Sequence, residues 1–343
     1  MRTPLCDLLG IEHPIVQAPI GTAAVPALAA AVSNAGALGM VALSWTNDVE
    51  RAIVETRALT ARPFGVNLLL EWDQRDRLEE ALAAGARIVS TAWGDAAGYA
   101  DRVREAGGLL VHTVASAAEA RAADADVLVA QGWEAGGHVA GEVATLPLVP
   151  AVVDAVDVPV VAAGGIGDGR GIAAALALGA QAAWLGTRFV LAEEAPVHDD
   201  YRRRLIDADE ADTVWLADLF DVGWPDAPHR ALRNSTVEAW ESAGRPRPGT
   251  RPGEGEVVAR RADGREIVRY TSGVPPAGAD GEIEALSLWA GQSVGVVREV
   301  KPAAEIVGDL VRETEEAVRR LSATTGSAGA PAERRPAPGR CAR

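Results

Sequence analysis

Lysine is almost absent from this chain of 343 residues, in which Lys301 is the only one. A phosphate-binding P-loop requires a Gly-Lys-Ser or Gly-Lys-Thr triplet, and the sequence contains neither. A Schiff-base aldolase needs a lysine amine at its active centre, whereas Lys301 stands beside Pro302 at the start of a late helical pattern. The sequence therefore argues against both enzyme classes.

Cysteine is also scarce. Cys6 and Cys341 lie near opposite ends of the chain, a pattern that gives no disulfide framework and is typical of a reducing compartment. The chain reaches Asp7 before an apolar segment could form, so we expect no signal peptide. These features together predict a cytoplasmic protein.

Long hydrophobic runs and an excess of positive charge are absent too. No segment has the roughly 18 consecutive apolar residues that a transmembrane helix needs, so we expect no membrane association. The 33 basic and 48 acidic side chains give a net charge of −15, which opposes binding to a phosphate backbone, so nucleic acid is not an expected partner. Apolar residues make up 48% of the chain, which is enough for a large buried core.

Short apolar runs alternate with helical patterns over the first part of the chain. Each run is too short and too uniformly apolar for a strand with one exposed face, and is typical of a strand buried on both faces. The predicted strands are Pro14–Ala18, Leu38–Leu43, Phe64–Leu69, Arg87–Thr91, Leu109–Val114, Val127–Ala130, Val158–Ala163 and Ala182–Phe189.

Helical patterns separate these runs, and several of them end at a glycine, the usual helix stop. The predicted helices are Val25–Asn34, Val49–Ala61, Gln74–Ala84, Ala96–Ala106, Ser116–Ala123, Leu146–Ala155 and Gly171–Leu178. Such regular alternation predicts an α/β fold, a (β/α)8 TIM barrel. A doubly wound open sheet is the alternative.

The regular alternation of strand and helix patterns ends after the last predicted strand. Two β-type runs, Val257–Arg261 and Glu266–Tyr270, flank an Asp-Gly pair, which predicts a hairpin. Residues 302–321 have the pattern of an amphipathic helix. The predicted parts are a (β/α)8 barrel over 1–196, a smaller C-terminal cap with the hairpin and the closing helix over 197–322, and a disordered tail rich in Ala, Gly, Pro and Arg over 323–343.

Glycines mark the ends of the last two predicted strands. Gly164 and Gly165 follow the seventh strand, and Gly186 and Thr187 lie at the end of the eighth. Glycine lets backbone N–H groups approach an anion, and a helix that begins there adds a favourable dipole. These two loops are the usual phosphate site of a TIM barrel, so we expect a phosphate group here. A tight turn without a ligand is the alternative for either loop alone.

His138 lies in a glycine-flanked loop after the sixth predicted strand. An imidazole titrates near neutral pH and is suited to proton transfer, so we expect His138 to be catalytic; a structural hydrogen-bonding histidine is the alternative. Glu134 is the only potential metal ligand beside it, and zinc would need more ligands, so no metal is expected. His112, inside the fifth strand, is predicted to be a core histidine or to point into the substrate pocket.

Three tryptophans each follow an even-numbered predicted strand: Trp45, Trp93 and Trp133. This placement puts three indole rings around one mouth of the barrel. Such rings can wall a flat cofactor or an apolar substrate, so all three are substrate-pocket candidates. Packing beneath the cap is the alternative.

Several motifs together resemble the nitronate monooxygenase family, also called 2-nitropropane dioxygenase-like, of FMN-dependent barrel enzymes. The resemblance covers nearly all of residues 5–320, and the combination of Glu-Ala-Gly-Gly-His with Gly-Gly-Ile-x-Asp-Gly is its most specific part. The segments that carry it are Leu9–Pro19, Gly65–Asn67, Gln131–His138, Ala162–Gly169, Gly186–Phe189 and Ala290–Gly295.

The resemblance implies FMN as the cofactor and His138 as the catalytic base. It implies that Asn67 and Gln131 hydrogen-bond the flavin ring system, and that Gly136 and Gly137 let the flavin lie close to the backbone. The cofactor-binding residues that it implies are Pro19, Ile20, Gly21, Asn67, Gln131, Gly136, Gly137, Gly164, Gly165, Gly186, Thr187 and Gln292.

The implied reaction is the oxidation of an alkyl nitronate or nitroalkane by FMN and O2 to a carbonyl compound and nitrite. The implied partners are this small molecule and O2, and a homodimer is compatible with the resemblance. Two departures stand out: Ile20 replaces the methionine that the family commonly has, and the late tyrosine and lysine of its best-characterised bacterial class are missing.

Other functions remain open. An FMN-dependent enoyl-acyl-carrier-protein reductase that uses NAD(P)H has similar glycine and histidine motifs, and a flavin-binding accessory protein without oxidase activity is a further alternative. A sugar-phosphate isomerase or lyase would share the phosphate loops, but usually has acidic or lysine residues at the strand ends. The amide, glycine and tryptophan residues expected there favour a flavin enzyme.

Overall fold

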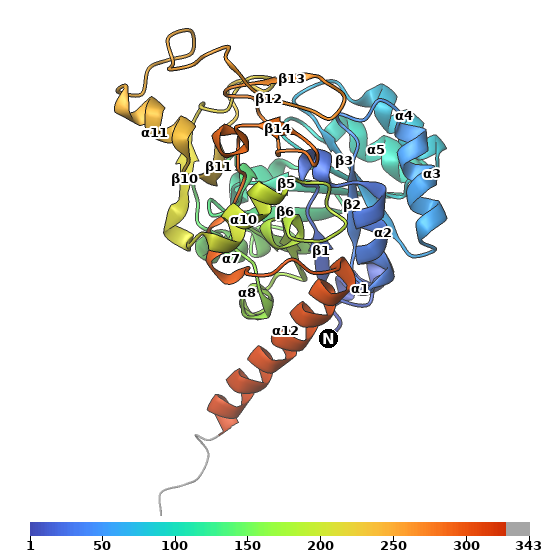
Figure 1. Ribbon diagram of the computed structural model, residues 1–343. Helices are drawn as coiled ribbons and strands as arrows, with labels where there is room; N and C mark the ends of the chain where they lie inside the picture. The colour runs from blue at the N-terminus through green and yellow to red at the C-terminus, as the bar shows by residue number, and fades with distance from the viewer. Residues whose placement is uncertain (327–343) are drawn as a thin grey trace, which may run out of the picture.

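Eight parallel strands form the centre of the molecule in the computed structural model, which describes residues 1–326 (Figure 1). The sheet runs in the order β1-β9-β8-β6-β5-β4-β3-β2. It closes where the N–H of Gln17 donates to the carbonyl of Leu38 at 2.9 Å, so the predicted TIM barrel is confirmed. The barrel strands are β1 (Ile15–Gln17), β2 (Gly39–Ala42), β3 (Phe64–Leu69), β4 (Ile88–Ala92), β5 (Leu109–Val114), β6 (Val127–Gln131), β8 (Val160–Ala163) and β9 (Ala182–Leu185).

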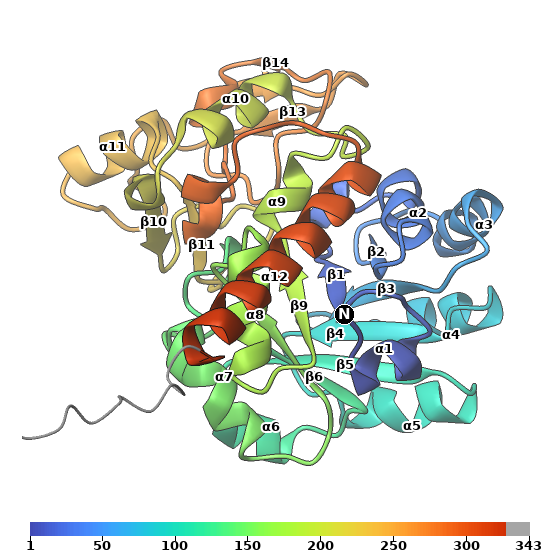
Figure 2. The same ribbon diagram turned by 90° about the horizontal axis from the view of Figure 1, so that it is seen from below.

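Side-chain alternation divides the buried strand residues between two layers. In β5, Val111 packs inside the barrel with Met40, whereas Leu110 packs between the sheet and the helices. Both faces of each strand are thus covered, which explains the uniformly apolar runs. Helix α1 (Pro4–Leu9), which the sequence analysis did not predict, places Leu5 and Cys6 in the inner layer at the amino end of the strands (Figure 2).

Helices surround the sheet and begin at recognisable caps. The Asp168 carboxylate accepts hydrogen bonds from the N–H groups of Arg170 and Gly171 and starts α8, and Asp48 caps α3 in a similar way. The barrel helices are α2 (Pro26–Asn34), α3 (Val49–Leu59), α4 (Arg75–Ala83), α5 (Ala97–Glu105), α6 (Ala117–Ala122), α7 (Thr145–Val153), α8 (Gly169–Ala177) and α9 (Thr187–Val190).

The last predicted strand was too long. The strand β9 ends at Leu185, and residues after Gly186 form the short helix α9. Apolar side chains of both elements, such as Leu185 and Phe189, are buried, so the pattern of apolar residues did not separate the strand from the helix.

The C-terminal helix belongs to the barrel wall rather than to the cap in which we placed it. Helix α12 (Ala303–Gly326) packs against α8 and α2, and Ile306 and Leu310 join the hydrophobic layer between the sheet and the helices. Figure 2 shows it crossing the underside of the molecule beside α8. It also runs past the predicted start of a disordered tail at 323, while residues 327–343 lie outside the described part of the chain.

The cap consists of segments between the short helix α9 and α12 (Figure 1). The predicted hairpin is present as β12 and β13, which pair in antiparallel fashion. The elements of this region are α10 (Asp199–Asp207), β10 (Thr213–Leu216), β11 (His229–Leu232), α11 (Ser235–Ser242), β12 (Val257–Arg260), β13 (Glu266–Val268), β14 (Asp280–Gly281) and the 3-10 helices η2 (Glu210–Asp212), η3 (Ile283–Ala285) and η4 (Gln292–Val296).

One strand joins the cap to the barrel. The loop after β6 contains β7 (Gly137–His138). This strand pairs with β11 and is the third strand of a cap sheet in the order β10-β11-β7. A further short turn, η1 (Gly21–Ala23), follows β1. None of the helices within residues 1–326 combines the length and hydrophobicity that crossing a bilayer requires.

The packing of α12 can be tested by truncating Ile306, which is fully buried. We expect Ile306→Ala to lower the free energy of unfolding by about 2–5 kcal/mol, because it leaves a void between α12 and the barrel. Urea-induced unfolding measures the loss. Val318→Ala, in an exposed part of the same helix, should change stability by less than about 0.5 kcal/mol. Equal losses in the two variants would contradict this packing.

Candidate active site

A cavity of about 530 Å3 opens at the carboxyl ends of the barrel strands, beneath the cap. Its size is that of a typical site for a cofactor or small molecule. Most of the sequence-predicted site residues line it. These residues are Pro19, Ile20, Gly21, Trp45, Asn67, Trp93, Gln131, Gly136, Gly137, His138, Gly164, Gly165, Gly186 and Thr187.

Glycines give the loop after β8 a conformation that other residues rarely adopt. Gly164 has φ +105° and Gly165 has φ +66°. A Cβ on Gly164 would lie only 2.8 Å from the carbonyl oxygen of Gly132, so no side chain fits there. The loop therefore turns its backbone toward the cavity, as an anion cradle requires.

The neighbouring loop after β9 is tied to the cap. Gly186 stands directly before α9, and the Thr187 hydroxyl accepts a hydrogen bond from the N–H of Gly291 at 3.0 Å. Gly291 in turn lies against Gly136, where an added Cβ would be 2.4 Å from the Gly291 nitrogen. The glycine at 136 is thus required by contact between two loops, a reason different from the close approach of flavin that the resemblance implied.

Two amide side chains face the cavity with part of their hydrogen-bonding capacity used. The Asn67 amide nitrogen donates to the carbonyl and hydroxyl of Ser90, at 3.3 and 2.7 Å, which orients the amide. The Gln131 amide nitrogen donates to the His138 carbonyl at 3.3 Å. The amide oxygens are therefore the groups that Asn67 and Gln131 can offer as acceptors to a ligand.

His138 lies at the centre of the cap side of the cavity. Its Nε2 is 3.3 Å from the Ser272 hydroxyl, and its ring lies 3.9 Å from the Trp224 ring, centroid to centroid. Burial lowers the pKa of His138 to about 3, and the neighbouring His229 adds a smaller effect in the same direction. The imidazole is therefore neutral at pH 7, and its surroundings disfavour the protonated form.

Indole rings form one wall of the cavity. Trp93 and Trp289 stand near His138, with ring centroids at 6.2 and 5.3 Å, and Trp93 also contacts Trp224 edge to face. Trp93 has φ +58°, which is unusual for a bulky residue and indicates that the surrounding contacts hold it in place. The wall can therefore present a rigid apolar surface to a flat ligand.

Three predicted site residues do not line the cavity. Trp133 instead packs beneath the Arg230 guanidinium, 4.5 Å from its ring centroid, and its carbonyl accepts hydrogen bonds from the same group. His112 alternates away from the barrel interior and bonds to the Thr91 hydroxyl at 2.8 Å, so it is a core histidine. The backbone N–H of Gln292 donates to the carbonyl of Glu134. The residues on either side of it, Gly291 and Ser293, line the cavity.

The Glu134 carboxylate also has a structural role. Its Oε2 accepts hydrogen bonds from the N–H and the hydroxyl of Thr145, at 2.8 and 2.9 Å, at the start of α7. It thereby links the His138 loop to a barrel helix. Lys301 forms ion pairs with Glu299 and Asp309, at 2.6 and 2.9 Å, and is not among the residues that line the cavity.

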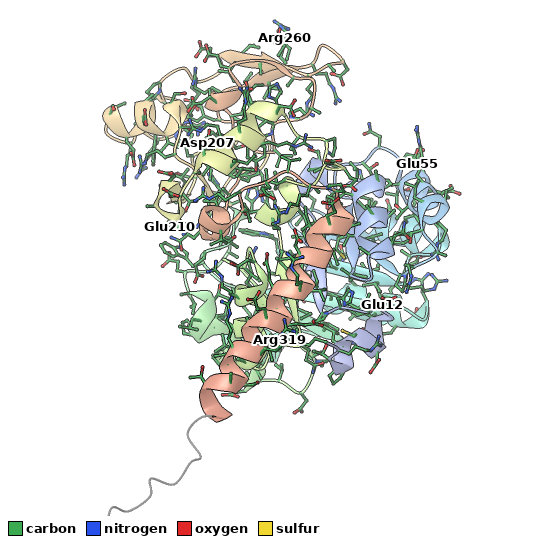
Figure 3. All side chains as sticks on the ribbon, turned by 60° about the horizontal axis from the view of Figure 1, so that its bottom comes forward. Glu12, Glu55, Asp207, Glu210, Arg260 and Arg319 are labelled. Carbon is green, nitrogen blue, oxygen red and sulfur yellow. The ribbon has the colours of Figure 1, made fainter. Side chains whose placement is uncertain are left out.

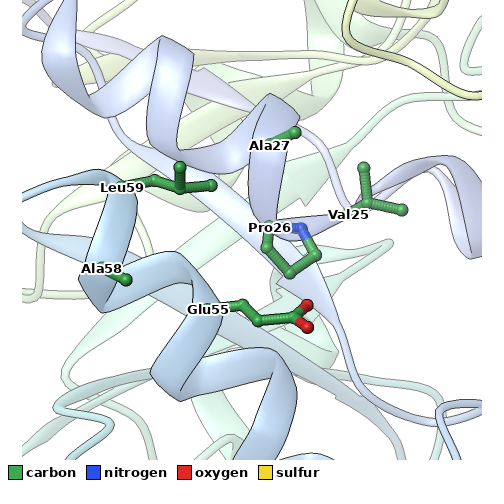
Figure 4. A pocket seen from close by; sticks show the side chains of 6 residues that line it. All are labelled: Val25, Pro26, Ala27, Glu55, Ala58 and Leu59. Carbon is green, nitrogen blue, oxygen red and sulfur yellow. The ribbon is translucent and has the colours of Figure 1, made fainter.

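A second hollow lies on the outside of the barrel, between α2 and α3 (Figure 4). It is lined by Val25, Pro26, Ala27, Glu55, Ala58 and Leu59. Glu55 is its only charged residue, and it holds no set of converging polar groups. The cavity around His138 is therefore the candidate active site.

Comparison with known proteins identifies the family. The family description "Nitronate monooxygenase" matches residues 2–81 and 72–313. The chain belongs to the nitronate monooxygenase family. Its members include oxidoreductases, and this chain is an enzyme of that general class.

Individual relatives of this family member differ in their named activities. The chain is 41% identical over 256 residues to a (3aS,4S,5R,7aS)-5-hydroxy-7a-methyl-1-oxo-octahydro-1H-indene-4-carboxyl-CoA dehydrogenase of Mycobacterium tuberculosis, covering 72% of this chain and 70% of that protein. It is 33% identical to a nitronate monooxygenase of Paraburkholderia phytofirmans, covering 93% and 97%. The structure of FabK from Thermotoga maritima superposes with a TM-score of 0.77 at 34% identity, covering 94% and 99%.

Several cavity residues of this nitronate monooxygenase family member were not predicted. Trp224, Ser272 and Trp289 come from the cap, whose packing no local pattern revealed. Ser293 also lines the cavity, and it is the centre of Gly291–Gly295, a Gly-x-Ser-x-Gly sequence. This segment forms the 3-10 helix η4 rather than the strand-to-helix turn of a nucleophile elbow.

His229 generates a testable pH dependence. It is fully buried, its Nε2 accepts from the N–H of Phe220 at 3.2 Å, and its Nδ1 donates to the carbonyl of Ala227 at 2.9 Å. Burial lowers its pKa from 6.5 to about 4. As pH falls through this range the unfolded chain takes up the proton first, so folding loses about 3 kcal/mol from this group.

We therefore expect His229→Gln to unfold with a weaker pH dependence than the parent between about pH 6.5 and pH 4. The variant is less stable at neutral pH, since it loses the bonds of the imidazole, but it lacks the titrating group. Chemical denaturation at several pH values measures both effects. Parallel curves for the two proteins would show that His229 is not buried in its neutral form.

Proposed function

We propose that this enzyme uses FMN to oxidise an alkyl nitronate or a nitroalkane with O2, giving a carbonyl compound and nitrite. The observation that carries the proposal is a neutral, partly buried imidazole, His138, in the same cavity as the glycine loops after β8 and β9. Membership in the nitronate monooxygenase family supports it.

The cavity fits the phosphate and the ring system of FMN. Gly164 and Gly165 expose backbone at one end, beside the start of α9, and these would hold the phosphate. Asn67 and Gln131 offer amide acceptors, which suit the N–H of a flavin ring. When bound, FMN supplies the electron chemistry of the reaction.

His138 would carry the proton transfer. A nitroalkane has an acidic hydrogen on the carbon beside the nitro group, and a neutral imidazole can accept it. The depressed pKa means that an imidazolium is stable here only beside a compensating negative charge. The nitronate anion formed by the transfer supplies that charge, so His138 would take the proton only with substrate in place. A nitronate that arrives already deprotonated needs no base.

The cap would keep water from the reacting carbon. Trp224 and Trp289 cover the His138 ring, and Ser272 meets its Nε2. The Ser272 hydroxyl can orient the imidazole and complete its hydrogen bonding when no substrate is present.

A second candidate is the oxidation or reduction of an acyl thioester, as in the enoyl-acyl-carrier-protein reductase reading of the sequence. Removal of a proton from the carbon beside a thioester carbonyl would also require His138 to accept a proton. Two observations favour this candidate: the 41% identity to a carboxyl-CoA dehydrogenase, and the guanidinium groups of Arg261 and Arg265 at the cavity. A flavin-binding accessory protein would gain little from the partly buried imidazole.

The first test is anaerobic mixing of the FMN-loaded enzyme with an alkyl nitronate and, separately, with NADH. We expect the nitronate alone to bleach the flavin absorption. In aerobic turnover of a nitroalkane, His138→Ala should keep FMN but lose about 10²–10⁴-fold in rate. His13→Ala, at the opposite end of the barrel beside Pro14 and Ile15, serves as the control. Bleaching by NADH alone would overturn the nitronate proposal in favour of a reductase.

The cofactor site is tested by Gly164→Ala. The added Cβ meets the Thr145 hydroxyl at 2.7 Å and the residue is held at a positive φ, so the loop must shift and its N–H groups move from the phosphate. We expect the Kd for FMN to rise at least about tenfold, measured by flavin fluorescence. Gly308→Ala, whose Cβ meets no atom within 4 Å, should bind FMN normally. Unchanged FMN affinity in a folded Gly164→Ala protein would contradict the assignment.

A further inference from the structure

Two positive side chains line the cavity of a strongly negative protein. Arg261 and Arg265 belong to the β12–β13 hairpin of the cap, and both contribute to the wall of the His138 cavity. The chain as a whole has a net charge of −15. A pair of guanidinium groups at the entrance therefore stands out as a local attraction for an anion.

The hairpin directs these two arginines to one face. The N–H of Arg261 donates to the carbonyl of Arg265 at 2.8 Å, so the two residues face each other across the turn and their side chains share a side. Arg260 and Glu266, the next pair, form an ion pair at 2.7 Å. Figure 3 shows Arg260 projecting from the top of the molecule, and it does not line the cavity.

Arg261 makes no direct ion pair in the part of the chain that the structure describes, although the nearby Asp263 carboxylate acts on it through space. Arg265 is bound by Asp263 at 2.6 Å, whereas no carboxylate in the described chain, residues 1–326, forms an ion pair with Arg261. Arg261 is also partly buried, while Arg265 is exposed. An unpaired, partly buried guanidinium at a cavity is suited to bidentate binding of a phosphate.

An exposed indole lies at the same cavity. Trp45 is 46% exposed although it is a large apolar residue, and it lines the cavity with the two arginines. Trp72 and Trp224 pack against its ring at 6.1 and 6.0 Å between centroids, which holds it in place. A supported indole with an open surface is a stacking platform for a nucleobase.

We propose that the mouth of the cavity binds a nucleoside diphosphate. Arg261, assisted by Arg265, binds the phosphates, Trp45 stacks on the base, and the rest of the ligand extends toward His138. Coenzyme A thioesters and NAD(P)H share this adenosine diphosphate part, so either the substrate or a reductant can be its source. The inference rests on the proposed flavin cavity but not on the nitronate as substrate.

The test measures binding to the FMN-loaded protein by titration calorimetry with ADP, coenzyme A and NADPH. We expect all three to bind and to compete with one another, since they share the recognised part. Arg261→Gln should weaken binding about tenfold, and Trp45→Ala several-fold. Arg260→Gln removes the same charge from the adjacent residue and should change the Kd by less than about twofold. Salt should weaken binding to the parent more than to Arg261→Gln.

The outcomes separate the two proposals. If ADP and coenzyme A bind but NADPH does not, the site serves a substrate, and if ADP and NADPH bind but coenzyme A does not, it serves a reductant; both results support the proposal. It is overturned if ADP does not bind, or if Arg260→Gln loses as much affinity as Arg261→Gln. A protein that oxidises nitronates but binds no nucleotide refutes only this inference, whereas one that binds nucleotide without oxidising nitronates refutes only the first proposed reaction.

Discussion

The pairing of β7 with β11 is the contact on which the site depends. Gly137 and His138 leave the barrel in the loop after β6, yet their backbone pairs with His229 and Arg230 of the cap. A free loop of this kind would leave the imidazole mobile, and its ordering would cost conformational entropy. The two-residue strand instead makes His138 part of a sheet, so the cap, not the barrel, sets its position above the cavity.

The same junction requires a close approach of backbones. Gly136 and Gly291 lie so near each other that a side chain at 136 would collide with the opposite chain, and Gly291 is held by Thr187 in the loop after β9. The histidine loop, the cap and one of the expected phosphate loops therefore meet at a single point. A displacement of any one of them would move His138 and the loop after β9 together.

Burial then determines what the imidazole can do. The rings of Trp224 and Trp289 replace water around His138, and this desolvation lowers its pKa. The site is thereby apolar around His138, lined by backbone at the glycine loops, and cationic where Arg261 of the cap hairpin lines it. Such a distribution of properties suits a ligand with an apolar reacting part and negatively charged ends.

Local patterns were sufficient to predict the barrel and many of the residues that line the cavity at the carboxyl ends of its strands. Apolar runs such as Leu109–Val114 identify strands buried on both faces, and parallel strands bring their carboxyl ends together, so Gly164 and Gly186 had to meet at one end. The cap residues Ser272, Trp289 and Arg261 could not be placed in this way, because irregular segments carry no periodicity. His112 and Trp133 lie outside the cavity for other reasons: His112 sits on the outward side of β5 and bonds to Thr91, and Trp133 packs beneath Arg230. The sequence by itself determined which backbone segments form the barrel, since burial on two faces fixes the composition and spacing of a strand. The tertiary structure alone decided which side chains surround His138, since those contacts join residues far apart in the chain, such as Ser272, which lies 134 positions after it.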